Sequence, residues 1–232
     1  MTKIRFNPTQ NSQAKKNFEI FSYNVLKNTK HKRIIEPIAF SNQLREIGDV
    51  FEKENQKEQM NKLTKKLAES LVSLQNHQLA GRAYSYLIKF NKDNRGFVEE
   101  CATNALIIAK RLHDPVHTMA RANDLKEIYK FTQPNSNKHL SILYDEKRAL
   151  NEIVKNYEGA KKRYVSTHTE MKPVERYEEK LAAIKIEIAE LLIKRGEKNT
   201  AKTELQEALK IYEKFGKGPN ADKAENLLKK IG

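Results

Sequence analysis

The sequence predicts an all-α chain in which antiparallel helix hairpins stack side by side. Only 8 Gly and 6 Pro occur among 232 residues, so most of the chain must lie in regular elements joined by short turns. Apolar side chains recur three or four positions apart along nearly the whole length, which is the period of a helix. No segment of the sequence sustains the strict alternation of apolar and polar residues that indicates a strand.

Capping and turn residues separate the expected helices. Pro37 falls in the first turn of one helix, where proline is tolerated. Asp114 is placed to cap the helix that begins at Pro115, and Gly196 stands where a glycine after a helix adopts positive φ. In chain order, the apolar stripes cover 18–26, 34–51, 63–74, 79–90, 96–112, 116–129, 140–154, 181–192, 201–212 and 220–231. With a helix around Ala160, we expect about eleven helices, arranged as five hairpins and a C-terminal capping helix at 220–231.

A spacing of about 40 residues recurs along the chain. Steps of 40, 40, 40 and 41 residues separate the positions that we assign to the second helix of each hairpin: Phe40, Ala80, Ala120, Ala160 and Ala201. A fixed period of this size is typical of helical repeat proteins, because one hairpin cannot bury its apolar face alone and a stack of hairpins can. The alternative is an irregular helical domain.

The last hairpin has the most informative pattern. Its apolar, small and glycine positions are Ile188, Ala189, Leu192, Gly196, Ala201, Leu205, Ala208 and Leu209. This pattern resembles the tetratricopeptide repeat over residues 184–213, with a weaker match over 61–131, where Gln75 replaces the glycine. The chain departs from that family in its period of about 40 instead of 34 residues, in Lys185 at a usually aromatic position, and in Glu213 at a usual proline position.

The resemblance implies a right-handed superhelix that binds a peptide or a helix of another protein in a concave groove. In the family, the first helix of each hairpin lines that groove. The corresponding positions here give the candidate peptide-binding residues Lys62, Lys65, Lys66, Asn104, Lys110 and Arg111, whereas the last hairpin offers the acidic Glu187 and Glu190. A groove that is basic at one end and acidic at the other would orient a charged segment. The alternative is that these side chains are ordinary solvated helix surface.

The N-terminal end is strongly basic. The first 33 residues hold eight Lys and Arg against one Glu, which accounts for half of the net charge of +14. These residues are Lys3, Arg5, Lys15, Lys16, Lys27, Lys30, Lys32 and Arg33. Such a segment attracts RNA, DNA or an anionic membrane surface, so a nucleic-acid-associated protein is the alternative function; a solvated basic tail is the simpler interpretation. We expect a flexible basic arm at 1–11 and a single helical-repeat domain at 12–232.

No motif of a catalytic, metal or cofactor site is found in the sequence. Pro115 interrupts the helical spacing of His113 and His117, so this pair does not predict a metal site. Cys101 has acidic neighbours, which raise a thiol pKa, and we expect it to be a small buried side chain. The sequence also lacks a serine nucleophile elbow and a dinucleotide-binding glycine pattern. We therefore expect a protein that is not an enzyme and needs no cofactor.

The composition also limits the cellular compartment and the kinds of partner that we expect. No apolar run approaches the roughly 18 residues of a membrane span, the first residues lack the apolar core of a signal peptide, and one cysteine excludes an internal disulfide. A cytoplasmic location is the expectation. We expect a scaffold or adaptor with a protein or peptide partner, and a homodimer through the N-terminal helices is an option if Phe18, Phe21 and Ile38 form an uncapped apolar end.

Overall fold

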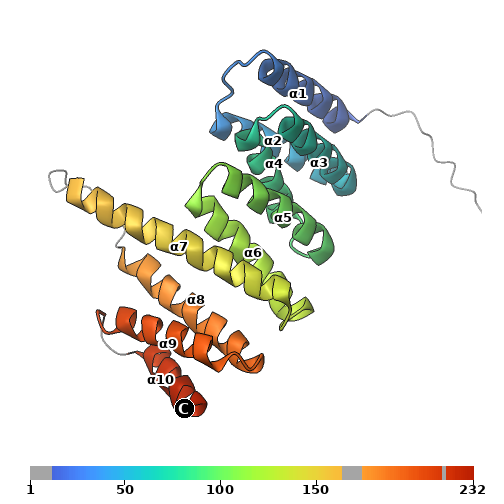
Figure 1. The fold of residues 1–232 in the computed structure, drawn as a ribbon. Helices are drawn as coiled ribbons and strands as arrows, with labels where there is room; N and C mark the ends of the chain where they lie inside the picture. The colour runs from blue at the N-terminus through green and yellow to red at the C-terminus, as the bar shows by residue number, and fades with distance from the viewer. Residues whose placement is uncertain (1–11, 164–173, 216–217) are drawn as a thin grey trace, which may run out of the picture. The chain divides into compact units, whose positions relative to one another are not determined.

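The structure of the protein is a computed structural model that describes residues 12–163, 174–215 and 218–232. Every regular element in these ranges is an α-helix, which confirms the predicted all-α class (Figure 1). The predicted arm at 1–11 lies outside the described residues. The ten helices of the described ranges are α1 (Gln13–Lys30), α2 (Pro37–Lys53), α3 (Lys57–Ser73), α4 (His77–Phe90), α5 (Arg95–Arg111), α6 (Pro115–Thr132), α7 (Asn137–Arg163), α8 (Glu175–Lys194), α9 (Lys198–Tyr212) and α10 (Pro219–Ile231).

The described residues form ten helices instead of the predicted eleven or so, because α7 is one long helix. It runs for 27 residues and contains both the predicted 140–154 stretch and Ala160. The residues between them include Gly159 but no proline. A single glycine costs a helix only about 1 kcal/mol, so nothing in this segment stops the helix. The prediction of a separate helix around Ala160 is therefore wrong.

The helices pack in sequence within two compact units, Met1–Ile108 and Ala109–Gly232, whose boundary falls inside α5. In the first unit, α1 packs against α2 and α3, and α3 packs most extensively against α4. In the second unit, the most extensive packing joins α6 to α7 and α8 to α9, and α10 follows against α9. This sequential packing is that of a helical repeat. The single domain predicted over 12–232 stays a prediction.

The predicted 40-residue register places Phe40, Ala80 and Ala201 on the second helices of packed pairs. These residues lie on α2, α4 and α9, and the pairs are α1–α2, α3–α4 and α8–α9. Ala120 lies on α6, the helix that covers the predicted 116–129 stretch. The register is wrong at Ala160, because Ala160 lies on α7, the same helix as the 140–154 stretch that was predicted to precede it in the hairpin.

Aromatic side chains build the core of the first unit. The ring of Phe18 meets those of Phe21 and Phe51 edge to face, at centroid distances of 6.2 and 6.4 Å, and Phe21 packs against Phe40 at 5.4 Å. All four phenylalanines are buried. Phe18 and Phe21 thus fill the interior and do not form the predicted dimer face with Ile38, which is 63% exposed. Dimerisation itself stays a prediction.

The core of the second unit is aliphatic. Leu143 and Leu150 of α7, Ile188 and Leu192 of α8, and Leu205 of α9 are fully buried in one cluster. Burial of a side chain of this size stabilises the fold by about 1.5–3 kcal/mol relative to leaving it in water. This cluster fixes α8 between α7 and α9.

One turn geometry recurs four times between consecutive helices. The residue at its centre has positive φ: Asn55 (55°), Gln75 (59°), His113 (50°) and Gly196 (81°). In each turn the preceding helix ends two residues earlier and the next helix begins two residues later. The central amide donates to the carbonyl three residues before it, and the next amide donates to a carbonyl five residues before. The prediction for Gly196 is confirmed, and Gln75 adopts the conformation of the glycine that it replaces.

A close contact joins α2 to α4. A Cβ atom added to Gly48 would lie 1.9 Å from the hydroxyl oxygen of Tyr86. The Tyr86 ring also stacks on Phe90, with centroids 4.3 Å apart. Burial, and next the carboxylates of Asp49 and Glu52, raise the pKa of Tyr86. The absence of a side chain at Gly48 is what lets the tyrosine pack here.

Candidate functional site

The predicted peptide-binding residues fall into two separate groups. Lys62, Lys65 and Lys66 lie on α3 and Asn104 lies on α5, in the first unit. Lys65 Nζ is 2.5 Å from Glu100 Oε1 of α5, and the hydrogen bond to Glu100 is the main cause that raises the pKa of Lys65. Lys62 and Lys66 are exposed. Lys65 thus links α3 to α5, and its charge is already paired.

Lys110 and Arg111 end α5 and belong to the second unit. Lys110 Nζ lies 2.6 Å from Asp145 Oδ2 of α7, at the edge of a hollow of about 210 Å³ between the end of α5, the start of α6 and α7. Arg111 is exposed. The structure therefore pairs Lys110 with a carboxylate of its own chain.

A larger hollow, of about 440 Å³, opens between α6 and α8. Met119, Ala120, Ala183 and Ile184 give it apolar walls. Its polar lining carries both signs of charge and consists of Arg121, Asn123, Asp124, Lys126, Glu146, Lys180 and Glu187. A ligand in this hollow would meet apolar contacts together with cations and carboxylates.

A buried ion pair lies in this hollow. Lys126 of α6 is 7% exposed, and its Nζ lies 3.3 Å from Glu146 Oε2 of α7 and 3.7 Å from Glu187 Oε1 of α8. Glu146 is 6% exposed. Burial raises the pKa of Glu146 above its ordinary value even though Lys126 acts to lower it. The ammonium of Lys126 thus connects three helices at one point.

This pair was not predicted from the sequence. Lys126 lies four residues after Ala122 and three before Tyr129, both of which are buried, so it shares the inward stripe of α6. A lysine within an apolar helical stripe is the feature of the sequence that could have indicated a buried, paired Lys126. Nothing in the sequence identified Glu146 of α7 as its partner.

A second hollow of about 440 Å³ lies between α8 and α10. Its lining includes Glu190 of α8, with Asp222, Lys223 and Leu227 of α10, and Lys223 Nζ is 2.8 Å from Glu190 Oε1. Ala183 and Glu187 line the first hollow and Glu190 lines the second, at spacings of four and three residues. One face of α8 therefore borders both hollows.

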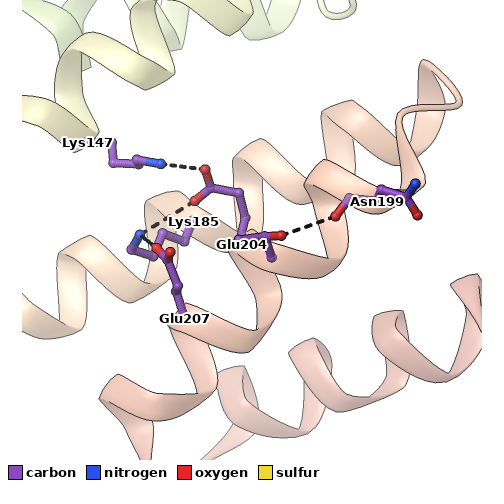
Figure 2. A network of polar contacts seen from close by, with 6 residues as sticks. Lys147, Lys185, Asn199, Glu204 and Glu207 are labelled. Atoms are coloured by element: carbon purple, nitrogen blue, oxygen red, sulfur yellow. Dashed lines mark hydrogen bonds and ion pairs between the residues drawn. The ribbon is translucent and has the colours of Figure 1, made fainter.

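On the opposite side of α8, a network of charged side chains joins this helix to α9, and α9 to α7 (Figure 2). Lys185, 5% exposed, lies 3.6 Å from Glu204 of α9 and donates a hydrogen bond to Glu207 of the same helix. Lys147 of α7 also donates to Glu204. The hydrogen bond from Lys185 is the main cause that lowers the pKa of Glu207. At the position where the resemblance leads one to expect an aromatic ring, Lys185 instead joins α8 to α9 by charge.

The basic N-terminal residues are solvated where the structure describes them. Lys3 and Arg5 lie outside the described residues. Lys15 is 3.9 Å from Glu19 of the same helix. The remaining members are exposed on α1 or in the turn after it: Lys16, Lys27, Lys30, Lys32 and Arg33.

Cys101 is fully buried on α5. Burial, and next the carboxylate of Glu100, raise the pKa of this thiol from 9.0 to about 12. In the part of the chain that the structure describes, no three His, Cys, Asp or Glu side chains gather as metal ligands would. Within that part there is also no helix with the length and hydropathy of a membrane span.

We expect Cys101 to be nearly inert in the folded protein. Near pH 8, a rise in pKa to about 12 lowers the thiolate fraction about a thousandfold, and burial also blocks the reagent. Reaction with a chromogenic disulfide reagent should be slow in buffer and fast in urea. The control is a Ser141→Cys, Cys101→Ala double variant, whose exposed thiol should react quickly in both. Equal native and unfolded rates for Cys101 would contradict this prediction.

Comparison with known proteins yields no family. No family model matches the chain, and no curated protein matches it significantly. Among solved structures, the crystal structure of BtubC (BKLC) from P. vanneervenii aligns with a TM-score of 0.31 and 12% identity over 90% of this chain and 95% of the other. The DHF119 filament aligns with a TM-score of 0.23 and 14% identity over 90% and 93%. Both similarities are too weak to assign a family or a function.

Proposed function

We propose that this protein is a non-catalytic binding module that holds a segment of another protein chain along the face formed by α6, α8 and α10. The observation that carries the proposal is the pair of hollows bordered by one face of α8. Glu187 and Glu190, which the tetratricopeptide resemblance places in a ligand groove, each line one of them. α8 is the first helix of the packed pair α8–α9, the place that the resemblance assigns to a helix that lines the groove.

The lining of the hollows indicates how a segment would be held. Met119 and Leu227 are partly buried side chains that offer apolar contact in the first and second hollow, respectively. Lys180 and Glu187 in the first hollow, and Asp222 in the second, supply charges of both signs. Apolar contacts would provide most of the binding free energy, and the charges would fix the direction of the segment. An affinity of roughly micromolar is typical of such a contact.

The test is selection from a random peptide library displayed on phage against the full chain. We expect enriched peptides whose dissociation constants rise about tenfold or more in an Ala183→Arg variant, because the new side chain fills the hollow between α6 and α8. The matched control is Gln206→Arg, which adds the same charge at an exposed position of α9. Peptides that bind wild type and Ala183→Arg equally well, or a selection that enriches none, would overturn the proposal.

A further inference from the structure

The outer face of α1 exposes apolar and basic side chains along one stripe. Spacings of four and three residues align its members, Lys16, Ile20, Tyr23, Lys27 and Lys30. Ile20 and Tyr23 are each 63% exposed, although the other side of α1 is buried in the aromatic core of the first unit. α1 therefore carries apolar side chains on two sides, and on the solvent-facing side they alternate with lysines.

The C-terminal half of this stripe borders a hollow of about 390 Å³. Tyr23 and Leu26 of α1 and Leu74, just after α3, form its apolar walls. Lys27, Lys30 and His31 complete the lining. The ammonium of Lys27 lies 5.8 Å from the centre of the Tyr23 ring, so cation and aromatic ring form one combined surface.

On α1 and in the turn after it, the charged side chains are almost all cationic. Residues 12–33 contain six Lys and Arg and one acidic residue, Glu19. Glu19 lies 3.9 Å from Lys15, which partly cancels its charge. Lys32 and Arg33 are exposed directly after the hollow-lining His31. An occupant that carries negative charge is therefore favoured over a neutral or basic one.

We propose that this surface docks an acidic amphipathic helix of another protein, with apolar side chains in the hollow and carboxylates over Lys27, Lys30 and the neighbouring cations. A helix presents apolar and acidic residues at the same three- and four-residue spacings as the stripe on α1. The surface is independent of the hollows beside α8, because it lies in the first unit.

The observations disfavour the other occupants. A second copy of this surface would bring lysine against lysine. Single-stranded nucleic acid stacks its bases on exposed aromatic rings, whereas two of the three apolar walls here, Leu26 and Leu74, are aliphatic. An amphipathic helix enters an anionic membrane with its apolar side chains projecting outward, whereas Tyr23, Leu26 and Leu74 here form the walls of a hollow.

The experiment measures binding of a fluorescein-labelled helical peptide of about 18 residues, with Leu at every third or fourth position and Glu elsewhere. A peptide with Lys in place of Glu, a uridine oligonucleotide and phosphatidylserine vesicles serve as comparison ligands. Two variants of the full chain test the surface: Lys27→Glu/Lys30→Glu changes its charge, and Tyr23→Ser/Leu74→Ser removes apolar contacts. Lys53→Glu/Lys57→Glu is the control, since both lysines are exposed elsewhere in the same unit.

We expect the acidic peptide to bind, and each of the two surface variants to raise its dissociation constant about tenfold or more. The control variant should change it less than about twofold. No binding of the acidic peptide, or binding that the surface variants leave unchanged, would overturn the proposal. Binding of the oligonucleotide or of the vesicles that responds to these variants, without binding of the acidic peptide, would also overturn it.

Discussion

Replacement of Lys126 by methionine is expected to lower the free energy of unfolding by about 3–5 kcal/mol. Methionine keeps the length of the apolar stem but removes the ammonium that lies 3.3 Å from Glu146. Glu146 then becomes a buried carboxylate without a cation in contact. Glu187, the other carboxylate near Lys126, has a side chain that is 42% exposed and can be solvated. Urea denaturation followed by circular dichroism measures the loss.

The loss should depend on pH. Burial already raises the pKa of Glu146 above 4.5, against the lowering effects of Lys126 and Lys180. The folded protein therefore holds this proton more tightly than the unfolded chain does, so its contribution to stability decreases as pH rises through the raised pKa. Lys126→Met raises this pKa further. The variant should thus lose stability more steeply with rising pH than wild type, and the difference between the two should shrink in acid.

Two further variants separate charge from packing. Lys130→Met makes the same change at an exposed position of α6 and should leave stability within about 0.5 kcal/mol of wild type. Glu146→Gln in the Lys126→Met background removes the buried charge and should restore most of the loss. If the double variant is no more stable than Lys126→Met, the pair does not act through charge.

Replacement of Gly48 by alanine is expected to destabilise the fold by about 1–3 kcal/mol. Alanine is the better helix former by about 1 kcal/mol, so a loss here must come from packing. The new Cβ would lie 1.9 Å from the Tyr86 hydroxyl, and the stacked Phe90 restricts the ring from moving away. Either the ring must leave its place or α2 and α4 must separate. Denaturant titration measures the change.

The matched control is Gly96→Ala, because nothing lies within 4 Å of a Cβ atom at that position of α5. It should be neutral or stabilising by up to about 1 kcal/mol. Tyr86→Phe in the Gly48→Ala background removes the closest atom and should recover part of the loss. A Gly48→Ala protein as stable as wild type would show that Tyr86 does not pack on Gly48.

Local signals in the sequence were enough to predict the helices and most of their ends. Asp114 caps α6 by accepting a hydrogen bond from the His117 amide at 2.9 Å, as its place before Pro115 predicts. Pro37 opens α2, and Gly196 has positive φ. These features depend on a few neighbouring residues. The repeat spacing predicts a turn before Ala160, but α7 continues through it because this segment contains no proline.

The candidate site was much less predictable. Glu187 and Glu190 were assigned to a groove by position in the last hairpin, and each lines a hollow. The buried contact between Lys126 and Glu146 joins different helices, so its partner depends on how α6 and α7 meet. Likewise, the partners of Lys65 and Lys110 lie 35 residues further along the chain. Pairings at such distances follow from packing geometry, which local patterns do not contain.

Three of the four equivalent turns place a side chain where a left-handed backbone disfavours one. Asn and His adopt this conformation more often than most residues, whereas Gln75 has no such advantage. Each of these sites therefore carries a small conformational penalty that glycine would relieve. The fold could therefore be made more resistant to heat than this chain is. Substitution of glycine at these turns alone would achieve this without a change to any helix face.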